Sequence, residues 1–225
     1  MAEPRGGQQR IPRPASFRAG EPPPWAALPA DRRRFSLTEV RRRLAALPPA
    51  REAVARVDGA RAAAVLVPLY EAAGETYVVL IKRPDSMPSH KGEIAFPGGK
   101  VEATDDGVRA TALREAHEEI GLSPDAVEVV AQLDGIGTVA SRFTITPFVG
   151  FLAARPALDP NPREVVRVLE VPLSELLDPA WFHEERWDIF GTEGGVFFFD
   201  LADETIWGAT ARILTSFLAH LVEGR

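Results

Sequence analysis

The sequence predicts one layered α/β domain preceded by an N-terminal arm. Short apolar runs typical of buried strands dominate the chain between residues 62 and 201. A charged helical pattern over residues 107–120 interrupts them, and an apolar helical pattern over residues 206–221 ends the chain. Few strands alternate with helices, which argues against a doubly wound sheet. The length of 225 residues suits one domain with an extension.

The composition excludes several classes of protein. The chain contains no cysteine, so it has no disulfide framework, cysteine zinc site, iron–sulfur cluster or thiol nucleophile. No apolar run approaches the ~18 residues that cross a bilayer, and the first residues lack the apolar core of a secretory signal. We therefore expect a cytoplasmic protein with no membrane partner.

The first 34 residues differ in composition from the rest. They contain seven of the 20 prolines and few large apolar residues, which predicts a mobile or loosely docked arm, rich in Pro and Arg, over residues 1–34. Residues 1–62 hold 13 of the 26 basic residues but only 6 of the 32 acidic ones. The remaining body is strongly acidic, and an acidic body is a poor match for nucleic acid. We expect no nucleic-acid partner.

The domain, residues 35–225, is expected to begin with a helix over residues 36–47. Ser36 and Glu39 have the spacing of a capping box, and Pro48 with Pro49 ends the pattern. The apolar residues at helical spacing are Leu37, Val40, Leu44 and Leu47.

Strands follow this helix. Ala62–Leu69 and Tyr77–Ile81 predict a hairpin, and residues 82–106, rich in Gly, Pro, Asp and Ser, predict an irregular segment. A short helix is expected at Pro172–Leu177 and a final amphipathic helix at Ile206–Leu221. The other strands are expected at Val127–Leu133, Ile145–Leu152, Val165–Val171 and Val196–Leu201.

The helix over residues 107–120 carries an unusual charge pattern. Asp106 is expected to cap its start, and Gly121 suits a left-handed residue after its end. Glu115, Glu118 and Glu119 fall within about 100° of arc on a helical wheel, beside the apolar stripe. Like charges so close destabilise a helix, and a divalent cation such as Mg²⁺ resolves the conflict. A plain solvated acidic face is the alternative interpretation.

A glycine-rich turn precedes this helix. Pro97-Gly98-Gly99 lets the backbone bend sharply and approach a ligand closely, and such loops present N–H groups to phosphate oxygens. A turn, an acidic loop and an acidic helix within one short segment are together far more specific than any of them alone.

This segment resembles the Nudix box, whose pattern is Gly, five residues, Glu, seven residues, and then Arg-Glu-apolar-x-Glu-Glu-x-Gly-apolar. The middle departs from that pattern, because six residues separate Gly99 from Asp106 and Asp replaces Glu. The residues that match are Gly99, Arg114, Glu115, Ala116, Glu118, Glu119, Gly121 and Leu122.

The longer loop resembles the coenzyme A pyrophosphatase branch of the Nudix family. The upstream stretch of that branch is matched by Arg83 and by His90–Gly99, whereas Pro84 and Pro88 stand where Ser or Ala and a second Arg are usual. Two more stretches that resemble the branch are residues 145–150 with 161–165, and residues 206–214.

The resemblance implies a Nudix-type α/β/α sandwich with a mixed central sheet. It also implies Mg²⁺ or Mn²⁺ held by Glu115, Glu118 and Glu119, the surest ligands being Glu115 and Glu119. Arg114 is expected to orient an acid of the 102–106 loop through a salt bridge. The general base is either Glu118 or Glu164, and a solvated loop acid is the alternative for Glu164. The residues expected on the substrate side are Arg83, His90, Lys91, Gly98, Gly99 and Lys100.

The leading functional hypothesis is a metal-dependent hydrolase that cleaves the diphosphate bond of coenzyme A or its derivatives to 3′,5′-ADP and 4′-phosphopantetheine. One alternative is a Nudix pyrophosphatase for NADH, ADP-ribose or dinucleoside polyphosphates. A second is a Nudix domain that binds a nucleotide without catalysis. In the first two cases the partner is a small-molecule nucleoside diphosphate. A homodimer is also expected, because dimers are common in the family that the chain resembles and the second half of the chain is rich in aromatic residues.

Overall fold

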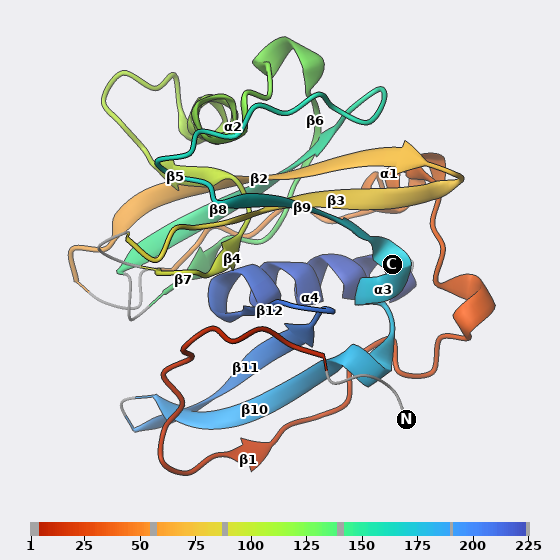
Figure 1. Cartoon of the computed structure of the whole chain (residues 1–225), viewed down its shortest axis with the longest axis vertical. Coiled ribbons are helices and arrows are strands. Elements are labelled where there is room, and N and C mark those ends of the chain that lie inside the picture. Colours follow the sequence, from red (N-terminus) through yellow and green to blue (C-terminus); the bar gives the residue numbers. More distant parts are fainter. Residues whose placement is uncertain (1–4, 55–57, 87–89, 139–141, 190, 224–225) are drawn as a thin grey trace.

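The central layer of the protein is a mixed β-sheet, seen edge-on in Figure 1. The computed structural model describes residues 5–54, 58–86, 90–138, 142–189 and 191–223. Within these residues the sheet has eight strands. They are β2 (Arg61–Ala72), β3 (Glu75–Lys82), β4 (Ile94–Ala95), β5 (Gly98–Lys100), β6 (Glu128–Gln132), β7 (Ile136–Gly137), β8 (Phe143–Phe151) and β9 (Arg167–Pro172).

The sheet is built around β2. This strand pairs in parallel with β8, from Arg61 opposite Phe143 to Leu69 opposite Phe151, and antiparallel with β3 and β5. The predicted hairpin is confirmed. Its turn is tighter than expected, because Ala73 and its neighbour Gly74 both have positive φ, as a two-residue type I′ turn requires. The segment predicted to be irregular contains the short strands β4 and β5.

One helix covers each face of this sheet, which confirms the predicted α/β/α sandwich. On one face α2 (Val108–Ile120) buries Ala112, Ala116 and Ile120 against residues of β2 and β3. On the other face α4 (Gly208–Glu223) buries Leu214 and Phe217 in the larger apolar core. Figure 1 shows the two helices on opposite sides of the strands.

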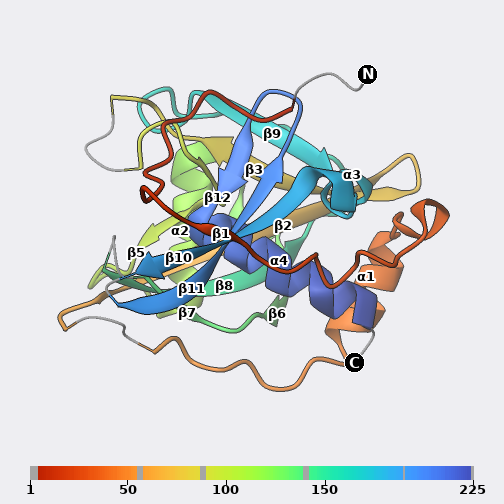
Figure 2. The same ribbon diagram turned by 90° about the horizontal axis from the view of Figure 1, so that it is seen from below.

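A second sheet packs on the far side of α4 and was not predicted as a separate layer (Figures 1 and 2). Its order is β1 (Arg18–Ala19), β10 (Phe182–Ile189), β11 (Thr192–Asp200) and β12 (Thr205–Trp207). Strand β10 contains Glu184, Glu185 and Arg186 in succession, so it has no apolar run that would mark it as a strand. Helix α4 lies between the two sheets, so both of its sides are covered, which explains why it is so apolar.

The N-terminal segment lies along this second sheet. Strand β1 pairs with β10, and the Gly6 N–H donates to the Leu201 carbonyl at 2.7 Å. Trp25 is fully buried, with its ring centroid 5.2 Å from that of Phe182 and 6.0 Å from that of Phe199. The segment is thus placed on the body by specific contacts, whereas its mobility stays a prediction.

The remaining helices are short. Helix α1 (Leu37–Leu44) starts at Ser36, whose hydroxyl accepts from the Glu39 N–H at 3.2 Å, and it ends earlier than predicted. Helix α3 (Leu173–Leu176) follows β9, and three 3₁₀ turns lie at η1 (Ala30–Arg32), η2 (Pro124–Ala126) and η3 (Pro179–Trp181). Across the described parts of the chain, none of the helices combines the length and the apolar character that a bilayer crossing demands.

Candidate active site

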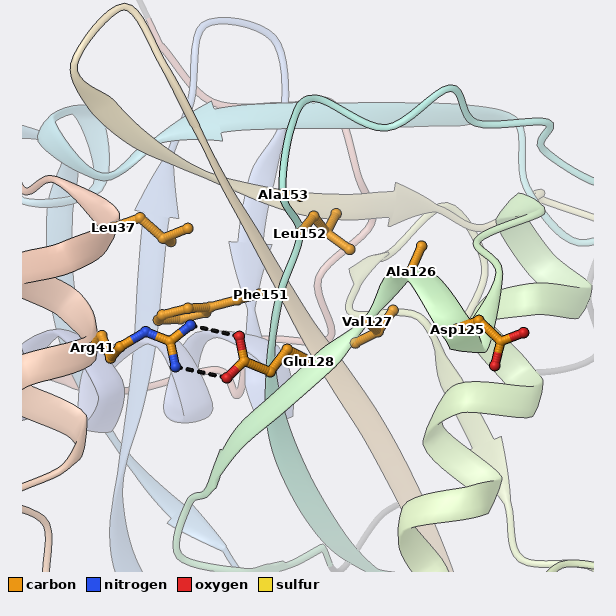
Figure 3. Close-up of a pocket in the computed structure, with 9 residues that line it drawn as sticks. All are labelled: Leu37, Arg41, Asp125, Ala126, Val127, Glu128, Phe151, Leu152 and Ala153. Atoms are coloured by element: carbon orange, nitrogen blue, oxygen red, sulfur yellow. Dashed lines mark hydrogen bonds and ion pairs between the residues drawn. The ribbon is translucent and has the colours of Figure 1, made fainter.

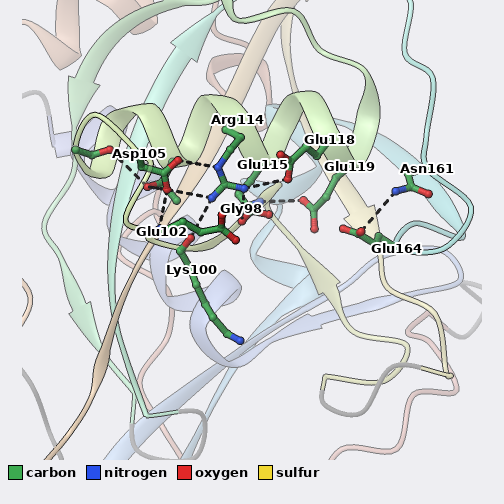
Figure 4. A network of polar contacts seen from close by, with 12 residues as sticks. Gly98, Lys100, Glu102, Asp105, Arg114, Glu115, Glu118, Glu119, Asn161 and Glu164 are labelled. Atoms are coloured by element: carbon green, nitrogen blue, oxygen red, sulfur yellow. Dashed lines mark hydrogen bonds and ion pairs between the residues drawn. The ribbon is translucent and has the colours of Figure 1, made fainter.

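The most buried acid of the predicted set is Glu119, on the face of α2 that meets β5 (Figure 4). Its carboxylate accepts from the Gly98 N–H at 2.9 Å and faces the Arg83 guanidinium at 3.3 Å. Only 1% of the residue is exposed. Burial raises the pKa of Glu119 to about 8, the Gly98 N–H and Arg83 oppose that rise, and Glu115 and Glu164 add to it. A carboxylate in such surroundings gains from a bound cation.

Glu115 lies one turn earlier on the same helix. Its carboxylate is half-buried, and burial raises its pKa while Arg114 opposes the shift. The carboxylate occupies the space above Gly99, where a Cβ atom would come within 2.3 Å of Oε1. A Cβ atom on Gly98 would lie 2.4 Å from the Ala64 carbonyl oxygen. Each glycine is therefore required for a different close approach, one by the carboxylate and one by the backbone of β2.

Arg114 makes the ion pair that was predicted with an acid of the 102–106 loop. Its Nε donates to Asp105 Oδ1 at 2.7 Å, and one terminal nitrogen donates to Glu115 at 3.0 Å and to Glu118 at 2.9 Å. The other donates to the Lys100 carbonyl at 3.1 Å. The guanidinium holds the pKa of Asp105 well below its usual range. Arg114 thus lies between Asp105, Glu115 and Glu118 and contacts all three, as Figure 4 shows.

The predicted cap of α2 is wrong. The helix begins after Gly107, which has φ 85° and offers no side-chain cap, whereas Asp106 was expected there. Asp105 takes the structural role instead, accepting from the Thr111 hydroxyl and from the Glu102 N–H, each at 2.8 Å. The strong pairing with Arg114 explains why Asp105 rather than its neighbour turns inward.

Glu164 reaches the acids from a distant part of the sequence. Its loop is clamped to the end of α2 by hydrogen bonds from the Asp159 N–H to the Ile120 carbonyl and from the Asn161 N–H to the Glu119 carbonyl, both 2.9 Å long. The Glu164 carboxylate faces that of Glu119 (Figure 4), and its charge adds to the raised pKa of Glu115 and of Glu119. These two hydrogen bonds were not predicted from the sequence, although Asn161-Pro162 is a recognisable turn signal.

The residues expected on the substrate side differ in their burial and in their partners. Within the described residues the Nε atom of Arg83 is buried without a hydrogen-bond partner. His90 instead pairs with Glu93 at 2.8 Å, which raises the pKa of the imidazole. Lys91 is exposed, and the side chain of Lys100 extends away from the carboxylates (Figure 4). Pro88 lies outside the described residues.

The acids suit a hard divalent cation in chemistry, because they are several carboxylates, partly desolvated and close to one another. Among the described residues, however, no three Asp, Glu or His side chains form a ready metal group. Arg114 holds Glu115 and Glu118 by hydrogen bonds. A bound cation would therefore compete with Arg114 for these two carboxylates.

A hollow of about 290 Å³ lies elsewhere, between α1, β6 and the end of β8 (Figure 3). It is bordered by Leu37, Phe151 and the closed ion pair of Arg41 with Glu128, whose two contacts measure 2.6 and 2.7 Å. Of its two acids, Glu128 is paired with Arg41 and Asp125 lies apart from it (Figure 3), so the hollow does not compete with the α2 site for metal chemistry.

The chain is similar to known proteins over the segment that carries these acids. The family model described as NUDIX domain matches residues 60–190. The Nudix hydrolase NudL of Photorhabdus laumondii is 38% identical over 157 residues, which cover 70% of this chain and 83% of that protein. The chloroplastic Nudix hydrolase 22 of Arabidopsis thaliana is 42% identical over 159 residues, covering 68% of this chain and 52% of the plant protein. The chain therefore belongs to the Nudix family of hydrolases.

Proposed function

We propose that this Nudix hydrolase cleaves the diphosphate bond of coenzyme A or its derivatives, with Mg²⁺ or Mn²⁺, to 3′,5′-ADP and 4′-phosphopantetheine. The observation that carries the proposal is the convergence of Glu115, Glu119 and Glu164 beside the Gly98-Gly99 turn. The choice of coenzyme A rests on the likeness of residues 83–99 to that branch. The expected homodimer and cytoplasmic setting stay predictions.

The proposed mechanism assigns one task to each group of side chains. Glu115, Glu118 and Glu119 would hold the cation, which when bound would neutralise charge on the diphosphate and lower the pKa of water. Arg114, anchored on Asp105, holds the carboxylates of Glu115 and Glu118 by hydrogen bonds.

Glu164 accepts the proton of the water whose oxygen attacks one phosphorus, and the bond from that phosphorus to the bridging oxygen breaks. Glu118, about half exposed at the edge of the site, is the competing base. Arg83, whose buried Nε–H has no partner among the described residues, donates to a phosphate oxygen of the substrate.

A second candidate is a Nudix pyrophosphatase for NADH, ADP-ribose or dinucleoside polyphosphates. Pro88 favours it, because the coenzyme A branch has an arginine at that position that could hold a phosphate. Loss of that cation would weaken selection for coenzyme A while leaving the chemistry at the carboxylates unchanged.

A hydrolysis panel separates these candidates. The purified protein is incubated with Mg²⁺ or Mn²⁺ and with coenzyme A, NADH, ADP-ribose or diadenosine tetraphosphate, and the products are identified by mass spectrometry. Reaction in ¹⁸O-labelled water shows which phosphorus is attacked. We expect coenzyme A to be the preferred substrate. Cleavage of another nucleotide with coenzyme A left intact would transfer the proposal to the second candidate.

Two matched variants test the site itself. Glu119→Gln removes a buried charge next to Gly98 and is expected to lower kcat by at least about a hundredfold. Glu128→Gln makes the same chemical change at an exposed position in the ion pair with Arg41, and it is expected to keep full activity. If Glu119→Gln retained full turnover, the metal-binding role of α2 would be wrong. Binding of nucleotide without turnover in the wild type would indicate a non-catalytic domain.

A further inference from the structure

The N-terminal segment makes a specific contact with β12. The side-chain amide of Gln9 pairs with the backbone of Thr205 in both directions, accepting from its N–H at 3.1 Å and donating to its carbonyl at 3.1 Å. The second N–H of the same amide donates to Glu204 at 2.8 Å. The Gln9 side chain therefore pairs with the backbone of β12 as a neighbouring strand would, and it also binds the Glu204 carboxylate.

That carboxylate belongs to a buried residue. Only 3% of Glu204 is exposed, and its other oxygen accepts from the Lys82 ammonium at 2.6 Å. Arg167 on β9 lies 3.8 Å from the same oxygen. A buried carboxylate is stable only with such partners, so Glu204 holds together three segments: the N-terminal segment, the turn before β12 and the end of β3.

The end of β3 is also the approach to the candidate active site. Lys82 is the last residue of β3, and Arg83 follows it directly. The side chain of Lys82 meets Glu204, whereas that of Arg83 meets Glu119 on α2. Successive side chains of an extended strand point to opposite faces of the sheet. The two neighbours therefore connect the second sheet to the carboxylates through one short piece of backbone.

We propose that Gln9 and Glu204 are positioning residues for Arg83. By holding Lys82, they fix the last residue of β3 and so the direction in which the Arg83 guanidinium leaves the backbone. The Pro- and Arg-rich N-terminal segment thereby supports the active site, although it contributes no group to the reaction. The inference rests on the proposed function in one respect, namely that Arg83 binds a substrate phosphate.

The role of Arg83 makes its placement important. Its guanidinium lies 3.3 Å from Glu119, and its buried Nε–H has no hydrogen-bond partner among the described residues. The backbone at this point has further restraints. Lys82 is paired with Ile94 of β4 and with Arg167 of β9, the Arg83 N–H donates to the Glu93 carbonyl at 3.0 Å, and the Val166 N–H donates to the Lys82 carbonyl at 2.9 Å. Loss of the Lys82 anchor should therefore loosen Arg83 without unfolding the sheet.

The test compares Gln9→Ala and Glu204→Gln with the control Arg18→Gln. Arg18 lies in the same N-terminal segment as Gln9 and forms an exposed ion pair with Glu193 of β11. It has no contact with Glu204 among those described. In the full-length protein we expect Gln9→Ala and Glu204→Gln to raise KM by about three- to tenfold, with kcat within about twofold of wild type. A purely structural role would instead lower kcat with the folded fraction and leave KM unchanged, which would overturn the proposal.

Two more measurements sharpen the test. In the double variant Gln9→Ala/Glu204→Gln, KM should be no higher than in Glu204→Gln alone, because both changes act through Lys82. Hydrogen exchange of residues 78–83, measured without substrate, should be faster in Gln9→Ala and Glu204→Gln and unchanged in Arg18→Gln. Unchanged exchange in all three would overturn the proposal. If the wild type hydrolysed no diphosphate, the proposed function would fail, and hydrogen exchange would still decide whether Gln9 and Glu204 hold the end of β3.

Discussion

Replacing Gly99 by alanine should damage catalysis far more than folding. The new Cβ atom would lie 2.3 Å from Oε1, 2.4 Å from Cδ and 2.6 Å from Oε2 of Glu115, against an ordinary contact distance of at least 3.4 Å. The carboxylate must therefore retreat by about 1 Å. Because a glutamate side chain can change rotamer, the loss of stability should be about 1 kcal/mol.

The catalytic loss should be larger. A displacement of about 1 Å in a group that positions the reaction costs about a hundredfold in rate, which corresponds to about 2.7 kcal/mol of activation free energy. The assay measures kcat/KM for the preferred substrate of the panel together with the thermal midpoint of unfolding. We expect Gly99→Ala to lose about two orders of magnitude in kcat/KM while its midpoint falls by a few degrees.

Two other glycines serve as controls. At Gly195 in β11 a Cβ atom would also meet a glutamate, because it would lie 2.2 Å from Glu184 Oε1. This position belongs to the second sheet and not to the one that carries the proposed active site. Gly195→Ala should keep its activity. At Gly98 the Cβ atom would meet the backbone of β2, which cannot move aside, so Gly98→Ala should mainly destabilise the fold. Wild-type kcat/KM in Gly99→Ala would refute the argument that Glu115 must occupy this space.

Three further predictions concern the arm, the loop acid and the metal. Trp25→Ala should reduce the free energy of unfolding by about 3–5 kcal/mol, because the indole is fully buried against two phenylalanine rings; urea titration measures this, and a loss below about 1 kcal/mol would mean that the arm is only loosely docked. Asp105→Asn should destabilise the protein at pH 7. Since the native pKa of Asp105 is lowered, that stabilisation is full above its unfolded pKa of 3.8 and is lost as the pH falls toward the lower native pKa, so the difference in unfolding free energy between variant and wild type should begin to shrink below about pH 4. Finally, chelation by EDTA should abolish hydrolysis, and Mn²⁺ should raise the unfolding midpoint of the wild type but not of Glu119→Gln; equal shifts in both proteins would exclude Glu119 as a ligand.

The local pattern of the sequence was sufficient for α2 and its acids. Helical spacing is enough to place Glu115 and Glu119 beside the apolar stripe of Ala112 and Ala116. The left-handed conformation that ends the helix favours glycine, and Gly121 adopts it with φ 68°. These features depend on neighbours within one or two turns, so they follow from the order of residues. The hairpin of β2 and β3 was predictable for the same reason.

Tertiary contacts decided what the local pattern could not. Asp105 turns inward rather than Asp106 because it is within reach of Arg114, nine positions later on the helix. Glu164 joins the acids because its loop is hydrogen-bonded to the end of α2, and Gln9 reaches Glu204 across 195 positions of sequence. Strand β10 is polar in sequence and forms because β11 and the N-terminal segment pair with it. Interactions between distant positions leave no periodic trace in a single sequence, so only the folded chain shows which acids and cations meet.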